Sequence, residues 1–317
     1  MYQMNTGMTR MGFPTVGAWV TYGLGSENQD LPAFVVLGNR MGTKGGAPNW
    51  GAGFLPSRYQ GTLLRARGTP LLNLGRPEGV TGERQRRMLD LIGALNRDHL
   101  RRHPDESELE ARIESFELAF RMQTSGRELA DLSGETEETL RLYGLKEEIS
   151  RPFGEKCLLA RRLVERGVRF VQVYVDDDWD AHASVAENHG TRCAETDAPI
   201  AGLLTDLKRR GLLETTLIVW GGEFGRLPVS ESGKGRDHNP EGFLVWAAGG
   251  GVRAGASFGE TDEIGHRAAV NPVSAHDLHA TFLHLLGMDH KRLTYLHNGR
   301  RFRLTDVEGS VLHPVLA

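Results

Sequence analysis

The feature that most limits what this chain can fold into is a regular alternation of apolar runs and amphipathic stretches from about residue 150 onward. The apolar runs are rich in β-branched residues and have the length of buried strands: 168–175 (VRFVQVYV), 215–222 (TTLIVWGG) and 243–251 (FLVWAAGGG). The amphipathic stretches have the length of helices, and each ends at a glycine: 152–167, 191–211 and 273–287. This alternation predicts an α/β fold in which helices sandwich a mostly parallel sheet.

The first half of the chain predicts one further strand and a helical insertion. Residues 32–38 (PAFVVLG) form a short apolar run bounded by proline and glycine, which indicates a buried strand. A loop rich in glycine and proline follows at 43–57, and its length favours a functional segment over a simple connector. From 81 to 143 the sequence is charged and amphipathic, with apolar residues at three- and four-residue steps. We therefore expect a single domain over 1–317 with a helical insertion at 81–143.

Composition argues against several classes of partner. The net charge of the 317 residues is −3, which offers no electrostatic basis for binding nucleic acid or an anionic membrane. No apolar run reaches about 18 residues, so no membrane span is expected. Residues 1–17 lack the charged region and apolar core of a signal peptide and read as the interior of a loop. The two cysteines, Cys157 and Cys193, show no metal or disulfide spacing, and we expect buried free thiols.

Acidic residues and histidines crowd the segment directly after the strand at 168–175. Four aspartates and two histidines fall within 176–189 (DDDWDAHASVAENH), and such crowding is costly unless a positive charge compensates it. Asp180 and His182 suit zinc or a similar divalent ion, with Asp178 as a competing ligand. The alternative interpretation is an acidic loop that caps the next helix.

Two further polar groups flank the next two strands. Glu223 follows the first of them, with Arg226 three residues later, and the alternative for the glutamate is a helix cap or a surface charge. Asp237 and His238 precede the second, where a lone histidine is more often a structural hydrogen-bonding residue. Three strand ends thus each offer a carboxylate, and two add a histidine. Because functional side chains gather at the carboxyl edge of a parallel sheet, we predict one metal site built from these ends.

Other candidates for function are weaker. His276, His279 and His284 fall on one predicted helix but not on a common face, so we expect packing and capping roles for them. The glycine-rich stretch 248–255 (AGGGVRAG) follows a strand but opens no helix, which makes a dinucleotide site a poor fit. The chain carries no GxSxG, Walker A or HExxH motif.

Several long motifs resemble those of one known family. They are WDAH (179–182), GGEFGRLP (221–228), GRDHNP (235–240), AGGGVRAG (248–255) and the stretch from HDLHATFLHLLG to DVEG (276–309). In this order they resemble the DUF1501 family, sulfatase-like proteins of the alkaline-phosphatase-like superfamily that are abundant in planctomycetes. Because the segment 4–37 resembles the middle of such proteins, the resemblance covers nearly the whole chain.

The resemblance implies an alkaline-phosphatase-like core with a divalent metal site at the carboxyl ends of its strands. By motif position, Asp180 and His182 match a mid-chain pair of ligands in that superfamily, and His238 matches its late histidine. Glu223 and Phe224 stand where the superfamily places an Asp-His pair for a second metal. Glutamate can bind a metal but phenylalanine cannot, so this position departs from the two-metal pattern.

The resemblance also implies that a region is missing from this chain. Family members begin with an export signal and a strand that carries a metal-binding aspartate, and the superfamily's nucleophile (serine, threonine or cysteine) follows. We therefore expect an N-terminally truncated chain without that nucleophile. Full-length relatives are expected in the periplasm or at the cell surface. For this chain, as written without a signal, the expected location is the cytoplasm or unknown.

Together these features predict a metal-dependent hydrolase of phosphate or sulfate esters that acts on a small anionic ester or on a sulfated or phosphorylated polymer. The expected ion is zinc, with manganese or calcium as alternatives, and it polarises the ester oxygen. Arg226 is expected to contact the anion, Asp237 to orient His238, and Asp178 to support the ligands. The alternative is a non-catalytic metal-binding scaffold for a polyanion or a protein partner, which the missing nucleophile region and Phe224 favour.

Overall fold

The structure is a computed structural model that describes residues 1–317 apart from 39–42, 66–74, 77, 104–106, 176–178 and 231–232. The described residues form a mixed α/β structure with eight α-helices: α1 Tyr2–Thr6, α2 Val16–Leu24, α3 Gly82–Arg102, α4 Ser107–Ala130, α5 Glu137–Leu142, α6 Arg151–Glu165, α7 Val185–Arg209 and α8 Ala275–Leu285. Their strands are β1 Phe34–Leu37, β2 Thr62–Leu64, β3 Phe170–Val173, β4 Ile218–Gly221, β5 Gly225–Arg226, β6 His238–Asn239, β7 Val245–Ala248, β8 Glu260–Thr261, β9 Ala268–Val270, β10 Tyr295–His297 and β11 Arg300–Phe302.

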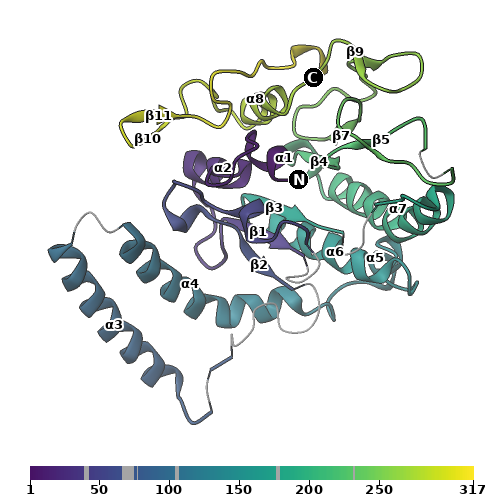
Figure 1. The fold of residues 1–317 in the computed structure, drawn as a ribbon. Helices are drawn as coiled ribbons and strands as arrows, with labels where there is room; N and C mark the ends of the chain where they lie inside the picture. The colour runs from purple at the N-terminus through teal and green to yellow at the C-terminus, as the bar shows by residue number, and fades with distance from the viewer. Residues whose placement is uncertain (39–42, 66–74, 77, 104–106, 176–178, 231–232) are drawn as a thin grey trace.

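A three-stranded parallel sheet, in the order β2-β1-β3, lies at the centre of the structure (Figure 1). In β1, Val35 pairs with Thr62 on one side and with Val171 on the other. All four residues of β1 are buried, because this strand has a neighbour on each edge and helices on each face. The apolar run predicted as a strand at 32–38 is therefore confirmed, and its β-branched character is typical of a parallel strand buried on both faces.

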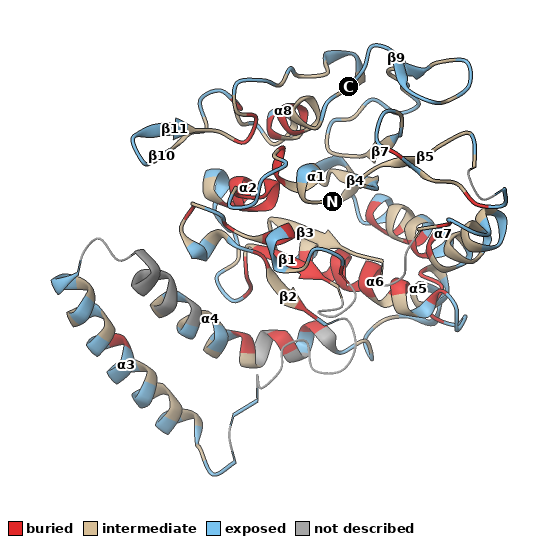
Figure 2. Cartoon of the chain, viewed as in Figure 1, coloured by how far each residue is buried: buried red, intermediate tan, exposed pale blue. Residues whose placement is uncertain are grey.

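Helices cover both faces of this sheet, and the buried residues concentrate in β1, α2 and α6 (Figure 2). On one face Val35 and Leu37 share a core with Leu163 of α6 and with residues of α4. On the other face α2 approaches Phe34 so closely that a methyl group at Gly17 would lie 2.6 Å from the phenylalanine ring. Glycine is therefore required at this contact, and the predicted sandwich of helices is confirmed for these three strands.

The segment 81–143, which the amphipathic pattern predicted to be helical, forms α3, α4 and α5 between β2 and β3. Met122 of α4 joins the core below the sheet, whereas α3 lies beyond α4 at the edge of the molecule (Figure 1). Arg86 of α3 donates two hydrogen bonds to the carboxylate of Glu117 in α4, at 2.7 and 2.9 Å, and so links the two helices.

The structure corrects the prediction for the later strands. β4 and β7 were expected to extend a mostly parallel sheet, but they pair with each other antiparallel, with Ile218 opposite Ala248. Within the described residues they form a separate two-stranded sheet. Parallel neighbours need a long crossover, usually through a helix, whereas the chain between β4 and β7 turns back through the short β5–β6 hairpin. The α/β class is thus confirmed, and the parallel arrangement is limited to three strands.

The predicted helix ends are confirmed at Gly167, Gly211 and Gly287, which have φ of 78°, 70° and 77° in the left-handed region that favours glycine. The two cysteines are free, as expected, although Cys157 is buried and Cys193 is only partly buried.

The first residues of the chain form a helix instead of the predicted loop interior. This helix, α1, packs against α8, where the ring of His279 is 2% exposed and hydrogen-bonds to the carbonyl oxygen of Met4 at 2.8 Å. The packing role predicted for His279 is therefore confirmed. The start of α8 is capped by a reciprocal pair of hydrogen bonds between Ser274 and Asp277, and not by a histidine.

Candidate metal centre

Two loops meet on one side of the molecule and carry the candidate site (Figure 1). The first leads from β3 into α7, and the second is the β5–β6 hairpin, in which Arg226 lies opposite His238. A backbone hydrogen bond of 2.9 Å from the amide of Arg236 to the carbonyl oxygen of Ala181 joins the two loops. The segments that the sequence placed before and after β4 therefore come together in space.

Gly235 and Asn239 explain how the hairpin approaches the first loop so closely. A methyl group at Gly235 would lie 1.8 Å from the carbonyl oxygen of His182, so only glycine fits this position. The Asn239 side chain is fully buried, and its amide donates to the carbonyl oxygen of His266 at 2.9 Å. These contacts hold the backbone on both sides of His238.

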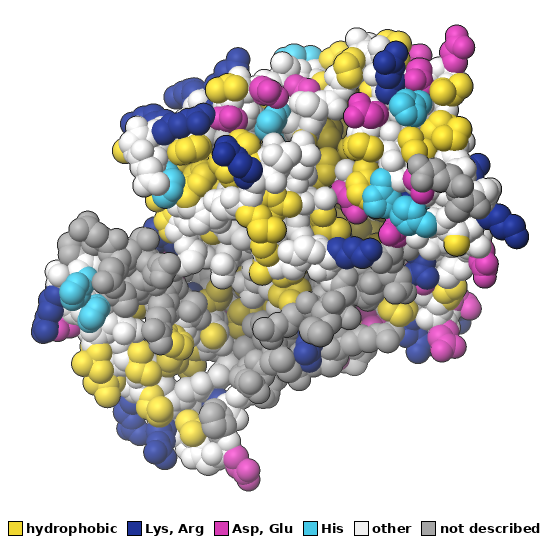
Figure 3. Space-filling model, in the orientation of Figure 1, with side chains coloured by type: hydrophobic (Ala, Val, Ile, Leu, Met, Phe, Trp, Pro, Cys, Tyr) yellow, Lys and Arg dark blue, Asp and Glu magenta, His cyan; other side chains and the backbone are white. Residues whose placement is uncertain are grey.

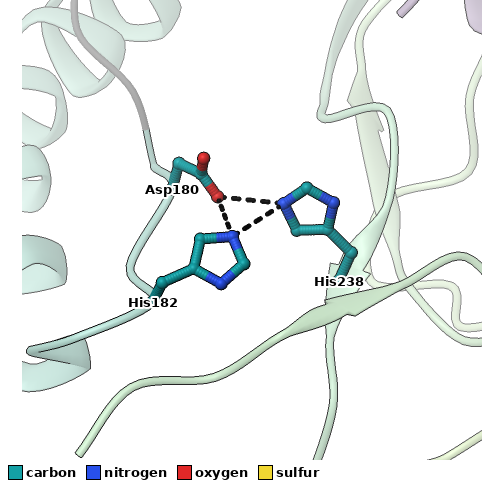
Figure 4. A group of neighbouring side chains, drawn as sticks. All are labelled: Asp180, His182 and His238. Atoms are coloured by element: carbon teal, nitrogen blue, oxygen red, sulfur yellow. Dashed lines mark hydrogen bonds and ion pairs between the residues drawn. The ribbon is translucent and has the colours of Figure 1, made fainter. Parts of the chain in front are cut away.

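The side chains of Asp180, His182 and His238 point toward one another across the two loops (Figure 4). Oδ1 of Asp180 lies 3.0 Å from Nε2 of His182 and 3.0 Å from Nε2 of His238, and the two Nε2 atoms are 3.1 Å apart. In the part of the chain that the structure describes, they are the one group of three or more His, Cys, Asp or Glu ligand atoms within 4.8 Å of one another. The structure thus brings together three of the residues that the sequence singled out.

The size and chemistry of this triangle fit a divalent ion. Four tetrahedral ligands bound to zinc at about 2.0–2.1 Å lie about 3.3 Å from one another, close to the 3.0–3.1 Å between these three atoms. Two imidazole nitrogens and one carboxylate are a donor set of the kind found in catalytic zinc sites, with a fourth position left for water or substrate. The side chains of Asp180, His182 and His238 are 32%, 49% and 45% exposed, so solvent reaches that position.

Asp237, which the sequence placed beside His238 as its orienting partner, contacts His182 on the other loop. Its Oδ1 lies 3.1 Å from Nδ1 of His182, so that nitrogen can donate a hydrogen bond to the carboxylate. With the proton on Nδ1, the lone pair of Nε2 faces the centre of the triangle, which is the tautomer that a metal ligand requires. Asp237 is thus a positioning residue for the histidine on the opposite loop.

Arg226 is bonded to Asp180 and to the backbone of both loops. Its Nη2 atom donates to Oδ1 of Asp180 at 2.6 Å and to the carbonyl oxygen of Trp179 at 3.1 Å, while Nη1 donates to the carbonyl oxygen of Arg236 at 3.1 Å. This guanidinium, with a hydrogen bond from His238, lowers the pKa of Asp180 to about 2. At neutral pH Asp180 is therefore ionised, the state in which a carboxylate binds a metal.

Two further residues touch the site in ways that the sequence did not indicate. The ring of Phe224 stacks on His238, with centroids 4.1 Å apart, so Phe224 helps to hold this imidazole in place. The amino group of Lys44 lies 3.9 Å from Oδ2 of Asp180. The available signal for Lys44 was its place in the glycine-rich loop 43–57, whose length favoured a functional segment.

Glu223 is not part of the triangle, although the sequence grouped it with these ligands. The described cluster of ligand atoms does not include it. The charge of Glu223 acts instead on Tyr174. Burial raises the pKa of the Tyr174 phenol, and the negative charge of Glu223 raises it further. Asp178 lies outside the described residues.

The fold and the site together define a mixed α/β protein with a candidate metal centre of two histidines and one aspartate on adjoining loops. The comparison with protein families is more specific, because the model of the family described as "Protein of unknown function (DUF1501)" matches residues 1–316. The chain belongs to this family, and the predicted membership is confirmed. None of the curated proteins and none of the solved structures matches the chain. Among the described helices, none has the length and hydropathy needed to cross a membrane.

Proposed function

We propose that this protein is a metal-dependent hydrolase of phosphate or sulfate esters. The observation that carries the proposal is the convergence of Asp180 Oδ1, His182 Nε2 and His238 Nε2 on one solvent-accessible point. Zinc is the first choice of ion because imidazole suits zinc, whereas manganese and calcium, the alternatives, prefer oxygen ligands. The proposed substrate is a small anionic ester or a sulfated or phosphorylated polymer.

Each residue around the triangle has its own role in this proposal. The three ligands would hold the ion, which supplies a Lewis acid that polarises an ester oxygen. Asp237 holds His182 in the tautomer that presents Nε2. Arg226 keeps Asp180 ionised, and together with Lys44 it brings positive charge to the place where an anion approaches. The attacking nucleophile is not assigned to a residue of this chain.

The finer fold assignment is part of the same proposal. We infer that residues 1–317 form one alkaline-phosphatase-like domain with the helices of 81–143 inserted into it. A parallel sheet covered by helices on both faces supports this assignment, as does the position of Asp180 and His182 after a strand of that sheet. The antiparallel β4–β7 pair is the feature that departs from it.

A second function rests on a different observation. Phe224 stacks on His238 where the superfamily pattern places a histidine, and Glu223 lies outside the triangle. Both features favour a centre for a single ion. A non-catalytic metal-binding scaffold that binds a polyanion or a protein partner requires no more than such a centre.

Metal analysis combined with an ester-hydrolysis assay separates these functions. The protein is stripped with a chelator, reloaded with zinc, manganese or calcium, and assayed with p-nitrophenyl phosphate and p-nitrophenyl sulfate. Bound metal with turnover, both lost in Asp180→Ala and His238→Ala but kept in the control His284→Ala, supports the hydrolase. Bound metal without turnover supports the scaffold, and a wild-type protein that binds none of these ions contradicts both functions.

A further inference from the structure

The glycine-rich loop that the sequence singled out carries Lys44 to the edge of the candidate metal centre. Lys44 is the second residue of a tight turn, which closes with a 3.1 Å hydrogen bond from the amide of Gly46 to the carbonyl oxygen of Thr43. The third residue of the turn, Gly45, has φ of 80°, the left-handed conformation that a type II turn requires there. The Lys44 side chain is 58% exposed, and its Nζ atom lies 3.9 Å from Oδ2 of Asp180. The turn thus presents an exposed ammonium group beside a candidate metal ligand.

The buried side chain of Asn49 fixes the backbone of this turn. Asn49 is 1% exposed, and its amide donates a hydrogen bond of 2.9 Å to the carbonyl oxygen of Lys44. The same amide packs directly against the turn, since a methyl group at Gly45 would lie 2.6 Å from its nitrogen. A buried asparagine needs partners for its polar atoms, and here one partner is the backbone of the residue that reaches the metal centre.

Polar contacts continue from Asn49 to the end of β3. The amide of Asn5 in α1 donates to Oδ1 of Asn49 at 3.4 Å, and Oδ1 of Asn5 accepts a hydrogen bond from Gln172 at 2.8 Å. Gln172 also donates to the hydroxyl of Tyr174 at 2.6 Å. From this network the chain runs into the loop that carries the first two candidate ligands. The turn with Lys44 and that loop are therefore anchored to the same strand, so the turn keeps a defined position relative to the metal centre.

Of the two cations that contact Asp180, Lys44 is the one placed to bind a substrate. Nη1 and Nη2 of Arg226 donate to Asp180 and to two backbone carbonyl oxygens, and the Arg226 side chain is only 17% exposed. The 3.9 Å between Lys44 and Asp180 is longer than a hydrogen bond, so this ion pair is loose. A lysine ammonium is a compact charge with three N–H donors on a flexible stem, and it can turn toward an oxygen of a group bound at the ion. Figure 3 shows histidine, acidic and basic side chains together at the surface on the right of the molecule, where β5 and α7 lie in Figure 1.

We propose that Lys44 binds the phosphate or sulfate group of the substrate and that Asn49 is the positioning residue that holds Lys44 for this contact. The inference rests on the proposed hydrolase function, because it places the anionic group at the open position of the ion. There the ammonium donates a hydrogen bond to an oxygen that the ion does not bind, and it offsets part of the negative charge of the group. Lys44 therefore favours esters with an anionic oxygen beside the ion over neutral ligands of the same ion.

Binding of inorganic phosphate to the zinc-loaded protein, measured by isothermal titration calorimetry, tests the contact with Lys44. Lys44→Gln removes the charge at an exposed position and is expected to weaken phosphate binding about tenfold, the size of one hydrogen bond to a charged group. Zinc affinity and the binding of neutral imidazole at the ion are expected to change little, because an exposed ion pair contributes little. Lys44→Arg is expected to keep most of the phosphate affinity. The control Lys208→Gln, at an exposed lysine in the last turn of α7, is expected to match wild type.

A double-mutant cycle tests the role of Asn49. Asn49→Ala is expected to weaken phosphate binding without changing zinc affinity. The double variant Asn49→Ala/Lys44→Gln is expected to bind phosphate no more weakly than Lys44→Gln alone, since both changes remove the same contact. A merely structural asparagine would instead add its own loss to that of Lys44→Gln. Circular dichroism checks the fold of each variant, and Asn49→Ser, which keeps a polar side chain, takes the place of Asn49→Ala if that variant unfolds.

The outcomes separate this inference from the function on which it rests. A parallel titration with inorganic sulfate shows which anion the wild-type protein binds more tightly, and a weakening for either anion in Lys44→Gln supports the contact. Unchanged affinity for both anions in zinc-loaded Lys44→Gln would overturn the inference and leave the proposed hydrolase standing. Loss of zinc affinity alone in that variant would also overturn it, because the lysine would then serve the ion and not the anion. A wild-type protein that binds no metal contradicts the proposed function itself, and the contact with Lys44 is then rejected with it.

Discussion

Acidification is expected to destabilise this protein through His279. The side chain is 2% exposed, and its Nε2 atom donates a hydrogen bond to the carbonyl oxygen of Met4 at 2.8 Å. In the described structure its Nδ1 atom is buried without a hydrogen-bond partner. The site therefore suits the neutral ring, and a second proton would create a buried charge. Burial accordingly lowers the pKa of His279 from 6.5 to about 4.

The sign and the size of the effect follow from proton uptake in the two states. The unfolded chain binds a proton at this histidine as the pH falls below 6.5, whereas the folded protein keeps the ring neutral down to about pH 4. The contribution of His279 to stability is therefore complete above pH 6.5 and declines between pH 6.5 and about pH 4. At about 1.36 kcal/mol for each pH unit, the whole decline amounts to roughly 3 kcal/mol.

Urea unfolding at about pH 7.5 and about pH 4.5 measures this loss. Between these pH values the wild-type protein is expected to lose about 2–3 kcal/mol more unfolding free energy than His279→Gln. The glutamine amide can still donate to Met4 but takes up no proton. His284→Gln, at an exposed histidine of the same helix, is the control and is expected to follow wild type. Equal losses in wild type and His279→Gln would refute the reasoning.

Three further perturbations test the site and the core. Asp237→Ala frees Nδ1 of His182 and is expected to weaken zinc binding about 10- to 100-fold in competition with a chromogenic chelator; unchanged affinity would remove its positioning role. Gly235→Ala places a methyl group 1.8 Å from the carbonyl oxygen of His182, so both the melting temperature and the zinc affinity are expected to fall. If the variant kept both, the two loops would not be packed as described. Arg161→Met removes a buried guanidinium that pairs with Glu135 at 2.7 Å and with the buried carboxylate of Asp206 at 3.1 Å, and it is expected to cost about 3–5 kcal/mol in urea unfolding. A loss below about 1 kcal/mol would contradict this.

The features that were predictable from the sequence are those with local causes. An apolar, β-branched run such as 32–38 is predicted as a buried strand because it is short, is bounded by proline and glycine, and must be hidden from water. Helices end at Gly167 and Gly211 because glycine adopts the left-handed backbone without strain. Asp180 and His238 were found for a chemical reason, since carboxylates and imidazoles placed beside strand ends are characteristic of metal sites.

The features that escaped the sequence depend on which segments become neighbours. Side chains alternate with the same period in parallel and antiparallel strands, so the sequence of β4 did not indicate that it pairs antiparallel with β7. Glu223, which the sequence grouped with the ligands, lies outside the cluster of Asp180, His182 and His238 in the described structure. Asp237 was matched with its neighbour in the chain, His238, but it contacts His182, which lies 55 residues away.

By itself the sequence predicted the α/β class and the ends of the main helices, and it named Asp180, His182 and His238 among four candidate ligands, because each of these follows from hydrophobicity, backbone freedom or ligand chemistry of nearby residues. Only the tertiary structure decided the direction of β4 and β7, the contact of Asp237 with His182 and the exposure of apolar side chains on α3 such as Leu91. An amphipathic helix has apolar residues on one side whether or not a neighbour covers them. Burial, charge pairing and coordination geometry are properties of contacts, and contacts between distant segments exist only once the chain has folded.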